Sequence, residues 1–129
     1  MARILIVEDN PDNMKLFRAL LTLKGHEVTA LQSGEGLLEA LDQIRPDLVL
    51  MDIQLPGKDG FALLAEIRTS PHAAVRVVAL TAHAMTGDRD RAHAAGFDDY
   101  ITKPIDIATF PEQVSKVLAG PTNDSRKPR

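Results

Sequence analysis

The chain has no cysteine, few aromatic residues and no long apolar run. Without cysteine, disulfides, thiolate catalysis and cysteine-ligated zinc are excluded. No apolar run approaches the roughly 20 residues of a membrane-spanning helix, and residues 1–3 lead into a predicted strand without the apolar segment of a signal peptide. Lysine and arginine form no broad stripe and the formal net charge is −3, which argues against direct nucleic-acid binding. We therefore expect a cytoplasmic protein without membrane insertion.

The sequence does contain enough apolar residues for one core. Hydrophobic residues make up 44% of the 129 residues, a length that suits one domain. We expect residues 1–119 to form that domain and the polar, basic residues 120–129 to form a flexible tail, with a docking segment as the alternative. Short apolar runs predict buried strands, and apolar residues at helical spacing predict helices between them. The predicted strands are 4–7, 28–31, 47–52, 75–80 and 100–102, and the predicted helices are 11–24, 33–44, 61–69, 88–95 and 107–118.

Strict alternation of strands and helices predicts an α/β fold. Right-handed crossovers then give a parallel sheet with helices on both faces. For five strands we expect the order 2-1-3-4-5 of flavodoxin-like sheets, that is, a doubly wound (βα)5 fold with a parallel five-stranded sheet. In this order the first and third strands are neighbours. Within the predicted helix 33–44, the residues expected to face the core are Leu37, Leu38, Leu41 and Ile44.

Acidic residues close two of the predicted strands. Glu8 and Asp9 follow the apolar run 4–7, and Asp52 ends the run 47–52. Open α/β sheets bind ligands at the carboxyl ends of their strands, where these three acids would meet. Carboxylates packed together repel one another and are costly to desolvate, so a cation is the natural explanation. Mg²⁺ suits such hard oxygen ligands, and the sequence therefore predicts a Mg²⁺ site.

A hydroxyl and an amine end the fourth and fifth predicted strands. Thr81 follows the run 75–80, and Lys103 follows the run 100–102. A lysine ammonium can pair with Asp52 or with a phosphate oxygen. Taken singly, these residues have ordinary explanations as strand ends, caps or surface charges, but their joint occurrence at the ends of four strands favours a functional site. The combination indicates phosphoryl transfer to Asp52.

The same residues lie in four segments that resemble the response-regulator receiver (CheY-like) domains of two-component signalling. The resemblance runs from the first strand to about residue 118. Outside these segments, residues 10–17 and 82–88 are similar to DivK-like single-domain cell-cycle regulators and to receivers attached to hybrid kinases. The four segments are 7–10 (VEDN), 51–60 (MDIQLPGKDG), 80–82 (LTA) and 100–104 (YITKP).

The resemblance implies roles for the acidic residues. Asp52 would be the phosphoacceptor, taking the phosphoryl group from a phosphohistidine on a histidine kinase or a histidine phosphotransfer protein. Asp9, Asp52 and the backbone carbonyl of Gln54 would bind Mg²⁺ directly. Glu8 stands at a position often filled by the shorter aspartate, and it would act mainly through a metal-bound water.

The resemblance also implies a switch. Thr81 and Lys103 would contact phosphoryl oxygens, and Thr81 would move toward the new charge so that Tyr100 could rotate inward. The family's turn at Lys103 and Pro104 has a cis peptide bond, which would aim the lysine into the site. Gln54 lies two residues after Asp52, and His83 lies two residues after Thr81. We expect the side chains at these two positions to tune the phosphate lifetime by steering or excluding water.

We expect a stand-alone regulator of a phosphorelay, a signalling switch rather than an enzyme that turns over metabolites. It would contact a downstream protein target through the surface of the fourth helix, fifth strand and fifth helix, as a monomer or weak homodimer. One alternative is a receiver excised from a hybrid histidine kinase. A flavodoxin-like carrier is disfavoured because the acids after the first strand would repel a phosphate, and an aspartyl phosphohydrolase is disfavoured because residues 52–54 (DIQ) lack a second acid.

Overall fold

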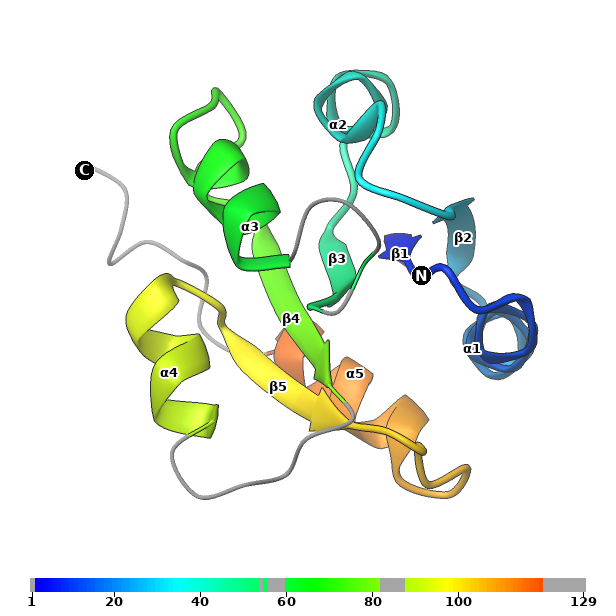
Figure 1. Cartoon of the computed structure of the whole chain (residues 1–129). Helices are drawn as coiled ribbons and strands as arrows, with labels where there is room; N and C mark the ends of the chain where they lie inside the picture. The colour runs from blue at the N-terminus through cyan, green and yellow to red at the C-terminus, as the bar shows by residue number, and fades with distance from the viewer. Residues whose placement is uncertain (1, 54, 56–59, 82–87, 120–129) are drawn as a thin grey trace.

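The computed structural model describes residues 2–53, 55, 60–81 and 88–119, and strands alternate with helices through all of this part (Figure 1). The tail 120–129 lies outside the described residues. No described helix is both long and apolar enough to cross a bilayer. The strands are β1 (Arg3–Val7), β2 (Glu27–Leu31), β3 (Leu48–Asp52), β4 (Arg76–Thr81) and β5 (Asp99–Thr102), and the helices are α1 (Pro11–Leu23), α2 (Leu37–Ile44), α3 (Gly60–Arg68), α4 (Asp88–Ala95) and α5 (Phe110–Ala119).

The five strands form one parallel sheet in the order β2-β1-β3-β4-β5, which confirms the predicted topology (Figure 1). β1 pairs with β3 so that Val7 lies beside Met51, and β3 pairs with β4 so that Asp52 lies beside Leu80. In the outermost strand, β5, Thr102 lies beside Thr81 of β4. The carboxyl ends of four strands therefore reach the same edge of the sheet.

Helices cover both faces of the sheet, and alternate residues of each strand divide between two cores (Figure 1). One core is formed with α2, α3 and α4 and includes Leu5 of β1; the other is formed with α1 and α5 and includes Ile4. The rings of Phe17 in α1 and Phe110 in α5 stack at a centroid distance of 5.3 Å. Residues 4–7 are fully buried because both faces are covered, as their unbroken apolar run predicts.

A side-chain cap and a proline mark the start of α1. The Asn10 side-chain oxygen accepts hydrogen bonds from the backbone N–H groups of Asp12 at 2.9 Å and Asn13 at 3.0 Å. Pro11 occupies the first helical position, where its missing N–H has no cost. This cap places the residues just before it, Glu8 and Asp9 after β1, in a fixed turn at the edge of the sheet.

Two helices begin later than predicted. α2 starts at Leu37 instead of residue 33 because Gly36 has a positive φ of 78°, which a helix does not tolerate. The prediction that Leu38 faces the core was also wrong, because Leu38 is 37% exposed. Ala40 is buried instead. α5 starts at Phe110 instead of residue 107, because residues 107–109 form a turn; Ile107 is 61% exposed.

Candidate functional site

Polar side chains from four strand ends meet at the carboxyl edge of the sheet. Glu8 directly follows β1, Asp52 and Thr81 are the last residues of β3 and β4, and Lys103 directly follows β5. Glu8, Asp52 and Thr81 are each only 1% exposed. Because buried polar groups are costly unless they are paired, their mutual contacts decide how this site is built.

Lys103 joins the two buried carboxylates. Its ammonium nitrogen Nζ lies 3.1 Å from Glu8 Oε1 and 3.0 Å from Asp52 Oδ2. The backbone N–H of Lys103 donates to the Thr81 carbonyl at 2.7 Å, and the peptide bond to Pro104 is cis, the isomer that the family's turn implies. Hydrogen bonds between charged partners are stronger than neutral ones, so the turn after β5 is held across the strand ends of β1, β3 and β4.

The pKa of the Glu8 carboxyl is raised from its ordinary 4.5 to about 7. Burial is the main cause, and the nearby Asp52 raises the pKa further; the backbone N–H of Asn10, which donates to Glu8 Oε2 at 3.1 Å, and Lys103 act in the opposite direction. For Lys103, burial favours the neutral amine, but the hydrogen bonds and charges of Asp52 and Glu8 outweigh it and raise the pKa of the ammonium. The lysine therefore stays charged.

The site has more negative than positive charge. Glu8, Asp9 and Asp52 each offer a carboxylate oxygen, and these oxygens lie within 4.8 Å of one another. Asp9 is exposed while the other two are buried, and Lys103 alone contacts both buried acids among the described residues. An all-oxygen donor set with excess negative charge, open to solvent on one side, fits a hard cation such as Mg²⁺.

Gly60 fixes the backbone that carries Asp52. The Gly60 N–H donates to the Ile53 carbonyl at 3.1 Å, and a Cβ at position 60 would lie 2.6 Å from Ile53 Cα and 2.9 Å from the Asp52 carbonyl oxygen. No side chain fits there. On the other side, the Ile53 N–H donates to the Leu80 carbonyl at 3.0 Å. Thus the start of α3 and the end of β4 hold the residue after Asp52 from two directions.

The remaining predicted positions divide into two groups. Tyr100 is half-buried against the core formed with α2, α3 and α4, and it lies beside Ala79 of β4. Thr81 lies two residues beyond Ala79, so Thr81 and Tyr100 share one face of the sheet. Gln54 and His83 lie outside the described residues.

Sequence reasoning missed two contributions to the site. Asn10 and Gly60 were identified only as members of the segments 7–10 and 51–60. The N–H of Asn10 also holds Glu8, and the missing side chain of Gly60 allows α3 to start directly against β3. A glycine that opens a helix soon after an acid-ended strand is the signal that could have identified the second of these.

The geometry agrees with comparisons to known proteins. The sequence model of the response regulator receiver domain matches residues 4–115. The chain belongs to the response regulator receiver domain family. This receiver domain is similar to the polar-differentiation response regulator DivK of Brucella ovis, at 43% identity over 119 residues, covering 89% of this chain and 94% of the relative. DivK of Brucella anthropi is 40% identical over 116 residues, with the same shares of the two chains covered.

Solved structures lead to the same family. The receiver domain of the sensor histidine kinase PA1611 from Pseudomonas aeruginosa PAO1 has a TM-score of 0.82 and 35% identity, covering 92% of this chain and 98% of that one. That structure holds a magnesium ion coordinated in the active site cleft. A response regulator structure from Chloroflexus aurantiacus has a TM-score of 0.85 at 29% identity, covering 92% and 98%. The predicted CheY-like fold and receiver family are confirmed.

Proposed function

We propose that this receiver domain is a phosphorylation-dependent switch in which Asp52 accepts a phosphoryl group from a phosphohistidine. The observation that carries the proposal is the buried Asp52 carboxylate, paired with Lys103 at 3.0 Å inside a group of three acids. The donor would be a histidine kinase or a histidine phosphotransfer protein. Family membership supports this donor class, and the arrangement of the site supports the acceptor.

In the transfer, an Asp52 carboxylate oxygen attacks phosphorus while the bond between phosphorus and the donor imidazole nitrogen breaks. The product is an acyl phosphate on Asp52 and a free histidine. Charge spreads over three phosphoryl oxygens, so catalysis is mainly positioning and electrostatic stabilisation. Lys103 would pair with one of these oxygens, and its contact with Asp52 at 3.0 Å supports this role. The Thr81 hydroxyl would donate to another.

Glu8, Asp9 and Asp52 would hold Mg²⁺, together with the Gln54 carbonyl, which lies outside the described residues. When bound, the ion supplies positive charge that stabilises the phosphoryl oxygens during transfer. The contact between Glu8 Oε2 and the Asn10 N–H keeps the carboxylate oriented toward the site. The magnesium ion in the PA1611 receiver domain supports the choice of metal.

Phosphorylation would switch the surface made by α4, β5 and α5. A phosphoryl group adds about −1.5 to −2 charge at pH 7, and Thr81 would turn toward it. Tyr100 lies on the same face of the sheet, beside the small Ala79, so movement of Thr81 changes the space that the tyrosine can occupy. Two packings of this face with different populations would then give two affinities for a downstream protein target.

We favour a stand-alone regulator over a receiver excised from a hybrid kinase. The similarity to the two DivK response regulators, at 40% and 43% identity, supports a regulator of that kind. The likeness to the PA1611 receiver domain supports the alternative, and the boundaries of the native gene separate the two. A cytoplasmic location, a monomeric or weakly dimeric state and a lifetime effect of Gln54 and His83 stay predictions.

The test is intact mass after incubation with acetyl phosphate. The wild-type protein should gain one phosphate in the presence of Mg²⁺, and the gain should disappear with EDTA and in Asp52→Asn. A gain that persists in Asp52→Asn would contradict the proposed acceptor. If neither protein gains mass, a phosphohistidine donor replaces acetyl phosphate, and failure with that donor would overturn the proposal.

A further inference from the structure

Helix α4 buries little apolar surface. Of its side chains at positions 90–95, only Ala92 is buried, and the next buried side chain along the chain is Phe97, beyond the end of the helix. Most helical stability in proteins comes from packing an apolar face. Contacts other than apolar burial must therefore determine where α4 sits.

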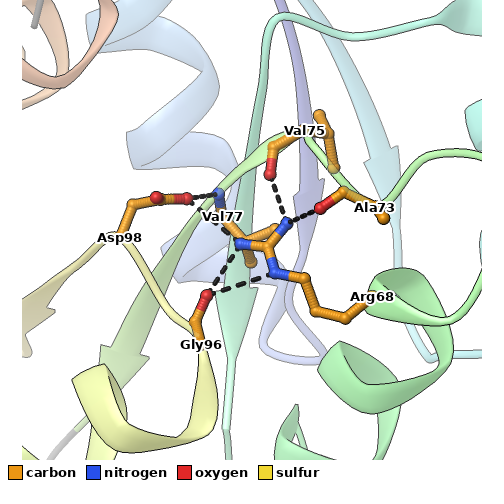
Figure 2. A network of polar contacts seen from close by, with 6 residues as sticks. All are labelled: Arg68, Ala73, Val75, Val77, Gly96 and Asp98. Carbon is orange, nitrogen blue, oxygen red and sulfur yellow. Dashed lines mark hydrogen bonds and ion pairs between the residues drawn. The ribbon is translucent and has the colours of Figure 1, made fainter. Parts of the chain in front are cut away.

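Arg68, at the carboxyl end of α3, makes such contacts (Figure 2). Its Nη1 donates to the carbonyls of Ala73 at 2.8 Å and Val75 at 2.6 Å, in the segment that leads into β4. Its Nη2 and Nε donate to the Gly96 carbonyl at 2.7 and 3.2 Å, just after α4, and Nη2 lies 3.2 Å from Asp98 Oδ2. One planar guanidinium thus joins α3 to the segments before β4 and after α4.

Asp98 extends this network into the sheet. Its Oδ2 accepts the Val77 N–H at 2.8 Å (Figure 2). Its own N–H donates to the Val77 carbonyl at 2.8 Å. The side chains of Arg68 and Asp98 are only 14% and 12% exposed. Because the pair is largely shielded from water and salt, the attraction between its two charges is screened less than in a surface ion pair.

Backbone hydrogen bonds cap the carboxyl end of α4. Gly96 has a φ of +112°, and its N–H donates to the His93 carbonyl while the Phe97 N–H donates to the Ala92 carbonyl, both at 3.0 Å. This pair of bonds is a Schellman cap, which terminates a helix with a glycine. Since Arg68 holds the carbonyl of the same glycine, the cap and the network restrain one point.

The contact with α3 nearer the amino end of α4 is of a different kind. The Arg91 guanidinium lies 4.6 Å above the ring of Phe61, which packs edge-on against Phe97 at a centroid distance of 5.5 Å. Arg91 is exposed, and a long side chain over a ring can follow a shift of the helix without losing the contact. Among the described residues, the contacts of α4 with α3 therefore differ between the two ends of the helix.

We propose that Arg68 is a positioning residue of the switch, which fixes the carboxyl end of α4 and the start of β5 so that α4 moves about that end. This inference rests on the proposed function, because it assigns a role in the response to phosphorylation. The Arg68 network lies at the amino end of β4 and β5, opposite the edge that carries Asp52. A fixed point there confines the change to the amino-terminal part of α4 and the carboxyl end of β5.

The test compares wild type with Arg68→Lys, and with Arg18→Lys, an exposed arginine in α1, as the matched control. A lysine keeps the charge but cannot reach all the acceptors at once. Backbone amide exchange is measured by NMR without metal at residues 96–98, with Leu50 in the central β3 as the report of global unfolding. In Arg68→Lys, we expect the exchange rates of residues 96–98 to rise at least tenfold more than the exchange rate of Leu50. In the control Arg18→Lys, these rates should stay unchanged.

The second arm adds Mg²⁺ and beryllofluoride, a phosphoryl mimic. In wild type, exchange should change at least threefold at residues 90–92 and stay within twofold at residues 96–98. In Arg68→Lys the change should extend to residues 96–98. If Ile53 beside the acceptor does not respond in wild type, the proposed function fails, while the metal-free comparison still decides whether Arg68 holds this end.

Two results would overturn the inference. In the first, Arg68→Lys raises exchange at Leu50 as much as at residues 96–98, which is the behaviour of a residue that only stabilises the whole fold. In the second, residues 96–98 of the wild type respond to beryllofluoride as strongly as residues 90–92. The second result would mean that α4 has no fixed end.

Discussion

Replacing Glu8 with glutamine should make the metal-free protein more stable at high pH. Glu8 is a buried acid whose pKa is raised by burial and by Asp52. Glutamine has nearly the same shape but no charge to desolvate, and its single carbonyl oxygen can accept from either the Asn10 N–H or Lys103, the two donors that Glu8 now contacts. In the variant, Lys103 keeps Asp52 as its charged partner at 3.0 Å. The ionised Glu8 carboxylate therefore lowers the free energy of unfolding when no metal ion is bound beside it.

The magnitude follows from the pKa. The Glu8 pKa moves from 4.5 in the unfolded chain to about 7 in the folded protein, and each pKa unit corresponds to about 1.4 kcal/mol. Between these two values the folded protein binds more protons than the unfolded chain, so the free energy of unfolding falls as pH rises through that window. At pH 8 the Glu8 charge therefore costs on the order of 3 kcal/mol, an effect that is absent below pH 4.5.

The assay is urea unfolding at several pH values between 4 and 8.5, with EDTA. The difference between Glu8→Gln and wild type should grow with pH to about 2–3 kcal/mol, and the exposed-acid variant Asp9→Asn should show much less. Mg²⁺ should stabilise wild type more than Glu8→Gln, since the ion favours the ionised acid. A Glu8→Gln protein that is less stable than wild type at pH 8, or a difference that does not vary with pH, would refute this reasoning.

Two further predictions concern the geometry around the acceptor. Gly60→Ala should lower the free energy of unfolding by roughly 1–3 kcal/mol, because the added Cβ would meet backbone atoms of Ile53 and Asp52; a change below about 0.5 kcal/mol in urea unfolding would show that α3 can shift at no cost. Lys103→Met should slow phosphorylation by acetyl phosphate by at least about tenfold, because one charge contact worth ~1.4 kcal/mol to the transferring group is lost. The affinity for Mg²⁺, measured by calorimetry, should stay the same or increase, because the variant lacks a positive charge beside the acids. An unchanged rate in Lys103→Met would exclude the lysine from the transfer.

The fold was predictable because its determinants are local. The apolar run at residues 4–7 has no polar position, which requires helices on both sides, and Asn10 and Pro11 mark the start of α1 without any knowledge of the rest of the chain. The start of α2 was less accessible. Gly34 and Gly36 lie in a segment with helical spacing, and only packing shows that a Cβ at Gly34 would meet Leu63 at 2.5 Å.

The composition of the site and the pairing of Lys103 with Asp52 were predictable, but the contacts of Glu8 were not. Acids, threonine and lysine at strand ends identify the edge where they meet, since parallel strands bring these ends together. One oxygen of the Glu8 carboxylate accepts from Lys103 and the other from the Asn10 N–H. The contact with Lys103 joins residues that are 95 positions apart in the sequence, so the sequence alone does not indicate it. Arg68 carries no sequence signal of its reach, because its partners Gly96 and Asp98 lie 28 and 30 residues further along the chain.

The central claim is that Asp52, and not another acid of the site, takes the phosphoryl group. Borohydride reduces an acyl phosphate to an alcohol, so an acceptor aspartate becomes homoserine and can be located by peptide mass spectrometry. After phosphorylation with acetyl phosphate and Mg²⁺, the account predicts homoserine at position 52 and an unmodified Asp9. Homoserine at position 9, or a phosphorylated protein in which position 52 remains aspartate after reduction, would contradict it.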